Sequence, residues 1–129
     1  YPIFSEIGLK EYKKNRSIKN ALKEIYFERK NFVGVTLGSK GVCWINNDIF
    51  FHCSVPKIKP VETNCAGDVF HGAFAAYISL NKSIEESILF ASSAATLKCM
   101  KHGGIYSIPD LKSTIGLYPN SDHILDISA

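Results

Sequence analysis

The stretch 61-VETNCAGDVFHGAF-74 places a polar loop directly before a run of small and apolar residues, with one carboxylate, Asp68, at the junction. Small and apolar residues on every side predict a central, mostly buried helix from Gly67 to about Leu80. A loop that ends at a helix start presents unpaired backbone N–H groups at the positive end of the helix dipole. The stretch therefore predicts an anion site, with phosphate as the natural ligand, beside a carboxylate.

The segments before this loop alternate between helical and strand patterns. Residues 17–30 carry apolar side chains at helical spacing, and residues 32–38 (FVGVTLG) form the short apolar run typical of a strand covered on both faces in a parallel sheet. Residues 41–45 and 49–55 are strand-like, and the residues at 46–48 (NND) tolerate the positive φ angles of a hairpin turn. A helix leading into a buried strand, with a hairpin beside it, predicts an α/β fold.

A second helix is expected after the loop, over residues 83–102. Ser83 and Glu86 have the spacing of a capping box, and Gly103 is placed to end the helix. We expect this helix to pack against the one that begins at Gly67. One apolar stripe runs along the helix over residues 83–102 and consists of Ile84, Ile88, Ala91, Ala95 and Cys99.

Composition excludes several classes of protein. The 129 residues are 46% hydrophobic with a net charge of +3, and the basic residues are mixed with acidic ones except in the lysine-rich segment 10–30, so nucleic acid is not indicated. No apolar run approaches the ~20 residues of a membrane span, and no signal-peptide pattern is present. The four cysteines form no C-x-x-C pair, which argues against zinc and for reduced thiols in a cytoplasmic protein.

Asp68 has two interpretations from physical chemistry alone. In the first turn of a helix it stays ionised, and it could accept a proton from a hydroxyl held opposite a phosphate, which would make the loop a phosphoryl-transfer centre. It could equally be an acid that favours a helix start. The residues alone leave both interpretations open.

Three segments resemble the ribokinase-like (PfkB) carbohydrate kinases. Residues 62–74 (ETNCAGDVFHGAF) resemble the family signature D-T-x-G-A-G-D-x-F, residues 35–42 (VTLGSKGV) are similar to its ATP-contacting V-T-L-G-x-x-G segment, and residues 101–109 (KHGGIYSIP) resemble its closing element R-x-G-A-x-x-S-x-P. The segments follow the family's order. The resemblance implies a layered α/β fold with a mainly parallel sheet flanked by helices and an antiparallel hairpin.

The resemblance also implies a domain organisation. Residues 1–129 correspond to the C-terminal, ATP-binding and base-carrying portion of one kinase domain, whose N-terminal, sugar-binding half is absent from this chain. The first residue, Tyr1, and a single methionine at position 100 agree with a fragment, which we expect to be inactive alone. The implied partners are a sugar and ATP, with a homodimer as a candidate state of the full-length protein.

The resemblance implies roles for individual residues. Asp68 would deprotonate the sugar hydroxyl, and the backbone of Ala66 and Gly67 would form the anion hole for the γ-phosphoryl group. ATP with Mg²⁺ is the implied cofactor, K⁺ is a further candidate, and no cluster of metal-ligating side chains is expected. The ATP contacts fall on Thr36, Gly38, Ser39, Lys40 and Gly41, and the monovalent-cation site falls on Glu62, Asn64, Gly103 and Ser107.

The sequence departs from the family pattern at several positions. Glu62 replaces the first aspartate of the signature and Cys65 replaces its first glycine. The magnesium-organising N-x-x-E pattern aligns with residues 5–8 (SEIG), where only Glu6 could substitute. These departures suggest an alternative function, a nucleotide-binding pseudokinase, and the presence of Asp68 weighs against it. His71 is expected either to face the site or to be a buried, hydrogen-bonded histidine.

Overall fold

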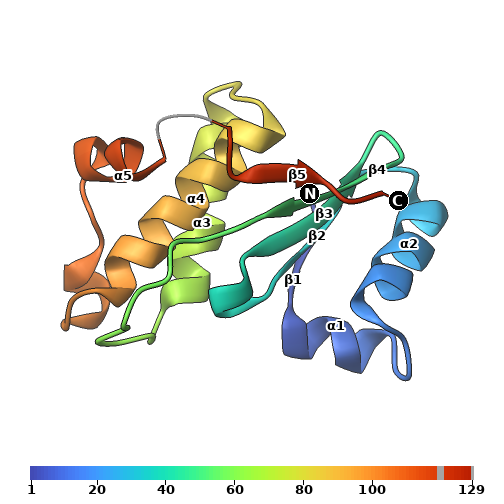
Figure 1. Cartoon of the computed structure of the whole chain (residues 1–129), viewed down its shortest axis with the longest axis horizontal. Helices are drawn as coiled ribbons and strands as arrows, with labels where there is room; N and C mark the ends of the chain where they lie inside the picture. Colours follow the sequence, from blue (N-terminus) through green and yellow to red (C-terminus); the bar gives the residue numbers. More distant parts are fainter. Residues whose placement is uncertain (119–120, 129) are drawn as a thin grey trace. The chain divides into compact units, whose positions relative to one another are not determined.

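The computed structural model describes residues 1–118 and 121–128, which form two compact units. The first unit contains Tyr1–Ser54 and the last strand of the chain, and the second unit begins at Val55 and extends to His123. Figure 1 traces the elements of both units along the chain. No helix in the described part of the chain combines the length and the apolar character needed to cross a bilayer.

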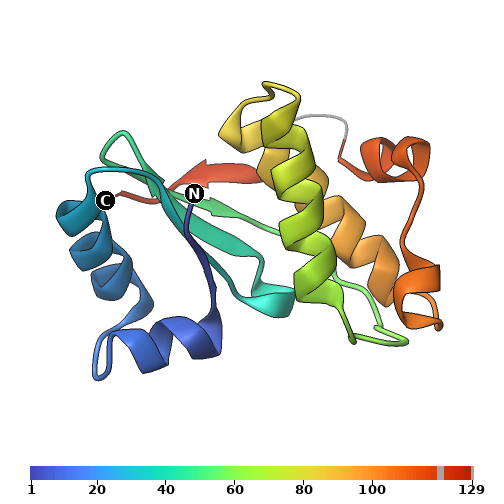
Figure 2. The ribbon, with the colours of Figure 1, turned by 180° about the vertical axis from the view of Figure 1, so that it is seen from behind.

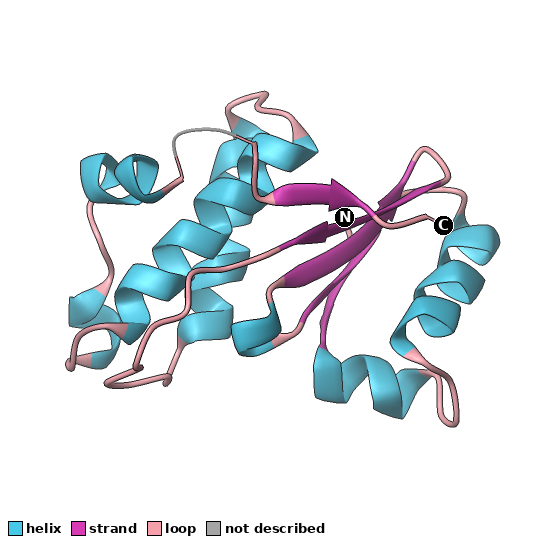
Figure 3. Cartoon of the chain, in the orientation of Figure 1, coloured by secondary structure: helices cyan, strands magenta, loops and turns pink. Residues whose placement is uncertain are grey.

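The first unit is built on a five-stranded sheet in the order β1-β2-β3-β4-β5 (Figure 3). The strands are β1 (Ile3–Ser5), β2 (Val33–Thr36), β3 (Val42–Asn46), β4 (Ile49–Cys53) and β5 (Ile124–Asp126). β1 and β2 pair in parallel, whereas the other three neighbouring pairs are antiparallel. The α/β class and the hairpin are confirmed, and the sheet is mixed.

The expected predominance of parallel pairing is therefore wrong within these five strands. Parallel neighbours need a long crossover connection, and β1 and β2 are joined by one that contains helices α1 (Glu6–Tyr12) and α2 (Ile18–Arg29). β5 pairs antiparallel with β4 after the long connection through the second unit. Short turns connect β2 to β3 and β3 to β4, and such turns force the chain to reverse.

Helices α1 and α2 pack against the first strands of the sheet (Figure 2). Both begin at a serine cap: the Ser5 hydroxyl accepts from the Gly8 amide, and the Ser17 hydroxyl accepts from the Asn20 amide. The helical spacing predicted from residue 17 onward is confirmed, and the buried face of α2 joins side chains of three strands in one core. That core contains Leu9, Ala21, Leu22, Ile25, Tyr26, Val33, Val35, Cys43, Ile45 and Phe50.

The β3–β4 hairpin turns where the sequence predicts it. Asn47 and Asp48 both adopt positive φ, 49° and 64°, as a two-residue turn of this hand requires. The Asp48 amide donates to the Tyr26 hydroxyl at 3.0 Å, so the turn is also fixed to α2.

The second unit is helical, with α3 (Ala66–Ser79), α4 (Ile84–Cys99), a 3₁₀ turn η2 (Gly104–Ser107) and α5 (Leu111–Leu117). α3 and α4 pack as neighbours, and Tyr77 stacks on Phe90 with ring centroids 3.7 Å apart. The capping box at the start of α4 is confirmed, with the Ser83 hydroxyl accepting from the Glu86 amide and the Glu86 carboxylate accepting from the Ser83 amide.

Two expectations for these helices are wrong. α3 buries only Val69, Phe70 and Phe74, whereas α4 is buried along most of its length. Six of the fourteen residues of α3 are glycine or alanine, which have little apolar surface to bury, so one covered face suffices. Gly103 does not end α4, which stops at Cys99; with φ of 122°, it precedes η2 instead.

Gly41 lies where no other residue fits. It follows the 3₁₀ turn η1 (Gly38–Lys40), its φ is 91°, and a Cβ placed on it would lie 2.0 Å from the Cys53 carbonyl oxygen. The turn can therefore approach β4 only because residue 41 has no side chain. Gly38 also has a positive φ, 58°, but a Cβ there would meet open space.

We expect Gly41→Ala to destabilise the chain by about 3 kcal/mol or more, because it combines a backbone clash with a forbidden φ. Gly38→Ala is the matched control, and it should cost only about 1 kcal/mol, the usual penalty of the left-handed region. Urea unfolding of the two variants measures the difference. Equal losses in the two variants would show that the approach of residue 41 to β4 does not constrain the turn.

Candidate functional site

The loop before α3 ends in a tight turn at Cys65. The Ala66 amide donates to the Thr63 carbonyl at 3.2 Å, and the Val69 amide donates to the Cys65 carbonyl at 2.9 Å. Cys65 is the N-cap of α3 and adopts the left-handed conformation, with φ of 61° and ψ of 7°. A residue with a side chain therefore adopts a backbone conformation that only glycine adopts without strain.

The first turn of α3 presents free hydrogen-bonding groups to solvent. Within residues 1–118 and 121–128, the amides of Gly67 and Asp68 and the Asp68 carboxylate have no hydrogen-bond or ion-pair partner. Asp68 is exposed, and a Cβ on Gly67 would meet nothing within 4 Å. The predicted anion site is thus partly open: the Gly67 amide is available, while the Ala66 amide is engaged by Thr63.

His71 lies one turn after Gly67, on the same side of α3. Its Nδ1 lies 2.7 Å from the Gly67 carbonyl oxygen, and since a carbonyl oxygen only accepts, Nδ1 carries the proton. The side chain is exposed, so the interpretation of His71 as a buried histidine is wrong.

The residues predicted to contact ATP lie in the first unit, at the end of β2 and in η1. Gly38, Ser39 and Lys40 are exposed, and the Thr36 hydroxyl donates to the Phe4 carbonyl at 3.4 Å. The turn is closed by the Gly41 amide, which donates to the Gly38 carbonyl at 3.0 Å. A compact, exposed turn of this kind can offer backbone amides to a ligand.

His52 supports this turn, and sequence reasoning gave it no role. Its Nε2 donates to the Lys40 carbonyl at 2.7 Å. His52 pairs with Cys43 across the hairpin, so β4 holds the imidazole under the turn. The signal that could have identified His52 is a polar residue within a strand-like apolar run.

Glu62 makes several polar contacts within the second unit. Its Oε1 accepts from Lys98 Nζ at 3.0 Å and from the Gly104 amide at 2.9 Å, and its Oε2 accepts from the Gly103 amide at 3.2 Å. Lys98 Nζ also donates to the Glu62 carbonyl at 3.1 Å. His102 Nδ1 lies 3.6 Å from Oε2 but remains exposed to solvent.

These donors lower the pKa of Glu62. The hydrogen bond from Lys98 is the largest cause, followed by the amides of Gly103 and Gly104, and together they bring the pKa from an ordinary 4.5 to about 2. Partial burial acts in the opposite direction and is outweighed. Glu62 is therefore a carboxylate under all ordinary conditions.

Lys98 was missed by sequence reasoning. Its side chain is 0% exposed, although lysine is almost never buried unless it is paired. It lies seven residues after Ala91, on the apolar side of α4, and a lysine on an apolar stripe is the signal that could have identified it. A basic residue in the last turn of a helix is usually explained by the helix dipole, so the sequence alone does not single out Lys98.

The other residues of the predicted cation site are dispersed around this pair. The Ser107 hydroxyl donates to the Gly104 carbonyl at 2.7 Å and is buried, whereas Asn64 is exposed. Glu6, the candidate magnesium ligand, accepts from Lys10 at 2.6 Å, and this ion pair lowers the pKa of Glu6. Across the described residues, no three His, Cys, Asp or Glu side chains gather as a metal site.

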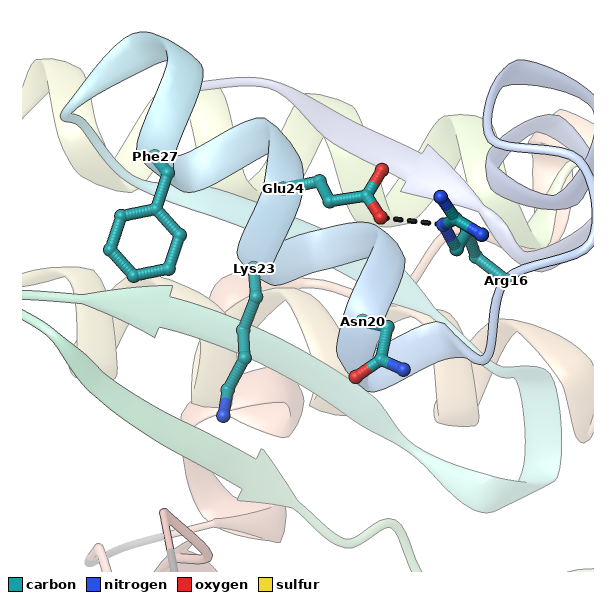
Figure 4. Close-up of a pocket in the computed structure, with 5 residues that line it drawn as sticks. All are labelled: Arg16, Asn20, Lys23, Glu24 and Phe27. Atoms are coloured by element: carbon teal, nitrogen blue, oxygen red, sulfur yellow. Dashed lines mark hydrogen bonds and ion pairs between the residues drawn. The ribbon is translucent and has the colours of Figure 1, made fainter.

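A pocket on the exposed side of α2 involves none of the predicted site residues. Figure 4 shows Phe27, Lys23 and Asn20 around it, with Glu24 accepting an ion-pair hydrogen bond from Arg16 at 2.5 Å. All five lining residues come from α2 and the turn before it, and the one acid is already paired with a base. The pocket contains no arrangement that suggests catalysis.

Comparison with known proteins decides the family. The family description "pfkB family carbohydrate kinase" matches residues 5–111, a range that includes all three resembling segments. The chain belongs to the pfkB family of carbohydrate kinases. The resemblance stated from the sequence is thus confirmed.

Relatives and solved structures of this family agree on the fold. A ribokinase of Lactococcus lactis is 40% identical over 91 residues, which cover 70% of this chain and 30% of that protein. The crystal structure of a Thermotoga maritima ribokinase matches with a TM-score of 0.83 and 30% identity, over 92% of this chain and 41% of that one. The structure of Arabidopsis thaliana ribokinase, solved with ribose and ATP, matches with a TM-score of 0.77 and 32% identity. The match covers 90% of this chain and 40% of that one.

This chain spans between 30% and 41% of the length of these relatives. The ribokinase-like α/β fold class is confirmed.

We expect Glu62→Gln to destabilise the chain near neutral pH, and this loss should shrink as the pH falls from about 4.5 toward about 2. A carboxyl group with a lowered folded-state pKa contributes stability that is present above its unfolded pKa and is lost as pH falls through the folded one. Urea unfolding across this range, with Glu11→Gln as an exposed control, measures the effect. A Glu62→Gln loss that is the same at all pH values would contradict the charged contacts of Glu62.

Proposed function

We propose that this chain is the C-terminal, nucleotide-binding and base-carrying portion of a kinase that transfers the γ-phosphoryl group of MgATP to a sugar hydroxyl. The observation that carries the proposal is the first turn of α3, where an unpaired Asp68 carboxylate lies beside the open amides of Gly67 and Asp68. Membership of the pfkB family supports the reaction class.

The proposed mechanism uses Asp68 as the general base. Its carboxylate takes the proton of the acceptor hydroxyl as the hydroxyl oxygen bonds to the γ-phosphorus, and the bond to the bridging oxygen of ADP breaks. The Gly67 amide and the positive end of α3 stabilise the charge on the migrating group. The Ala66 amide would join them by exchanging its bond to the Thr63 carbonyl for one to a phosphoryl oxygen.

The nucleotide is proposed to contact η1 and its flanks. Gly38, Ser39 and Lys40 expose backbone and an ammonium group, Thr36 precedes the turn, and Gly41 shapes it. The segment contains no P-loop pattern, so this turn would have to contact the nucleotide in another way. Mg²⁺ enters as part of the substrate MgATP.

Ribose is the first acceptor to test. The Lactococcus relative is named a ribokinase, and the Arabidopsis ribokinase was solved with ribose and ATP. Fructose-like and nucleoside acceptors are the alternatives that the same assay compares. A cytoplasmic location remains part of the proposal.

The isolated chain should bind MgATP without turning it over. Calorimetry at millimolar nucleotide should show binding, and Lys40→Met should weaken it, whereas Lys14→Met, an exposed lysine outside the turn, should not. A coupled ADP assay with ribose should remain at background, because the sugar-binding portion is missing. Absence of binding would contradict the nucleotide assignment, and sugar-dependent turnover by the chain alone would contradict the proposed division of the kinase.

In the complete kinase polypeptide that contains this chain, Asp68→Asn should lower kcat by about 100- to 10,000-fold, the usual contribution of a general base. Nucleotide affinity and melting temperature should change little, because the amides of the first turn remain. Glu85→Gln, which removes an acid from the first turn of α4, is the control and should keep kcat. An unaltered kcat in Asp68→Asn would remove Asp68 as the base, and a complete protein that binds MgATP but phosphorylates no sugar would favour a pseudokinase.

A further inference from the structure

The buried ammonium group of Lys98 makes the contacts that an inorganic cation would make. Lys98 Nζ lies 3.0 Å from a carboxylate oxygen of Glu62 and 3.1 Å from the carbonyl oxygen of the same residue. Carboxylate and carbonyl oxygens are also the ligands expected for K⁺ at this loop. Ammonium and potassium ions carry the same charge and have nearly the same size.

The carboxylate of Glu62 has no oxygen left without a donor. Oε1 accepts from Lys98 and from the Gly104 amide, and Oε2 accepts from the Gly103 amide. A K⁺ ion against this carboxylate would lie beside an ammonium group and two N–H dipoles, all of which repel it. The residues present do not fit a separate monovalent cation bound to Glu62.

The same contacts fix the loop that leads to α3. The amides of Val61 and Glu62 both donate to the Cys99 carbonyl, at 2.8 and 3.2 Å, next to Lys98 in the last turn of α4. Glu62 precedes the first residue of α3, Ala66, by four positions. A cation at Glu62 therefore helps to fix the loop before α3 against the end of α4, four residues before the proposed anion site begins.

We propose that the Lys98 ammonium takes the place of the monovalent cation, so that this loop is held by a cation covalently attached to α4 and needs no K⁺. Glu62 then serves as the ligand of a lysine rather than of a metal ion, and the Gly103 amide donates to the second oxygen of its carboxylate. The proposal concerns the cation of the loop and holds whether or not the complete protein is a kinase.

The test measures thermal unfolding of the chain in KCl, NaCl, ammonium chloride and choline chloride at matched ionic strength. The wild-type chain should melt at the same temperature in KCl and NaCl. Lys98→Ala should melt lower and should regain stability in K⁺ or ammonium salts, on the order of 3 °C or more above its value in Na⁺. Lys101→Ala, an exposed lysine of the same segment, should behave as the wild type.

A wild-type chain that K⁺ stabilises more than Na⁺ would overturn the proposal, and this measurement does not depend on any variant. A folded Lys98→Ala variant that does not distinguish K⁺ from Na⁺ would also overturn it. If Lys98→Ala does not fold, Lys98→Met combined with Glu62→Gln removes both charges, and this variant should fold and respond equally to the two salts. A K⁺-specific response of this double variant would place the ion elsewhere and contradict the role of Glu62.

Discussion

The ammonium group of Lys98 is fully buried, and its described contacts are both to Glu62. A buried charge is costly unless a partner of opposite sign and good geometry accompanies it, so the position of Glu62 is fixed by α4. Glu62 in turn receives the amides of Gly103 and Gly104, which start the 3₁₀ turn after α4. The Glu62 carboxylate thus joins the loop before α3 to the last turn of α4 and to the loop after α4.

This arrangement has a direct consequence for the start of α3. The loop is fixed at Glu62 on one side, and on the other side the Val69 amide bonds to the Cys65 carbonyl. Between Glu62 and Cys65 lie only Thr63 and Asn64, which set the direction of the chain. The exposed Asp68 carboxylate and the open Gly67 amide are therefore presented by a short segment with both ends held.

Local signals predicted much of the fold, because they depend on residues close in sequence. The helical spacing from residue 17, the capping box at Ser83 and the positive φ angles of Asn47 and Asp48 are properties of a few neighbouring residues, and the sequence predicts each of them. Contacts between distant segments could not be recognised in this way. The pairing of Lys98 with Glu62 joins residues 36 positions apart, and the partial exposure of α3 depends on which face α4 covers.

The turn at Cys65 depends both on its local backbone conformation and on contacts with distant segments. Its left-handed backbone costs an ordinary residue roughly 1–2 kcal/mol, and the glycine of the family signature at this position would avoid that cost. In this chain the conformation is retained with a side chain present. Because Lys98 and the Cys99 carbonyl hold the chain just before the turn, and α3 holds it just after, alternative loop conformations would break several bonds at once. The loss of glycine at position 65 is therefore tolerated where the flanking contacts leave the loop little freedom.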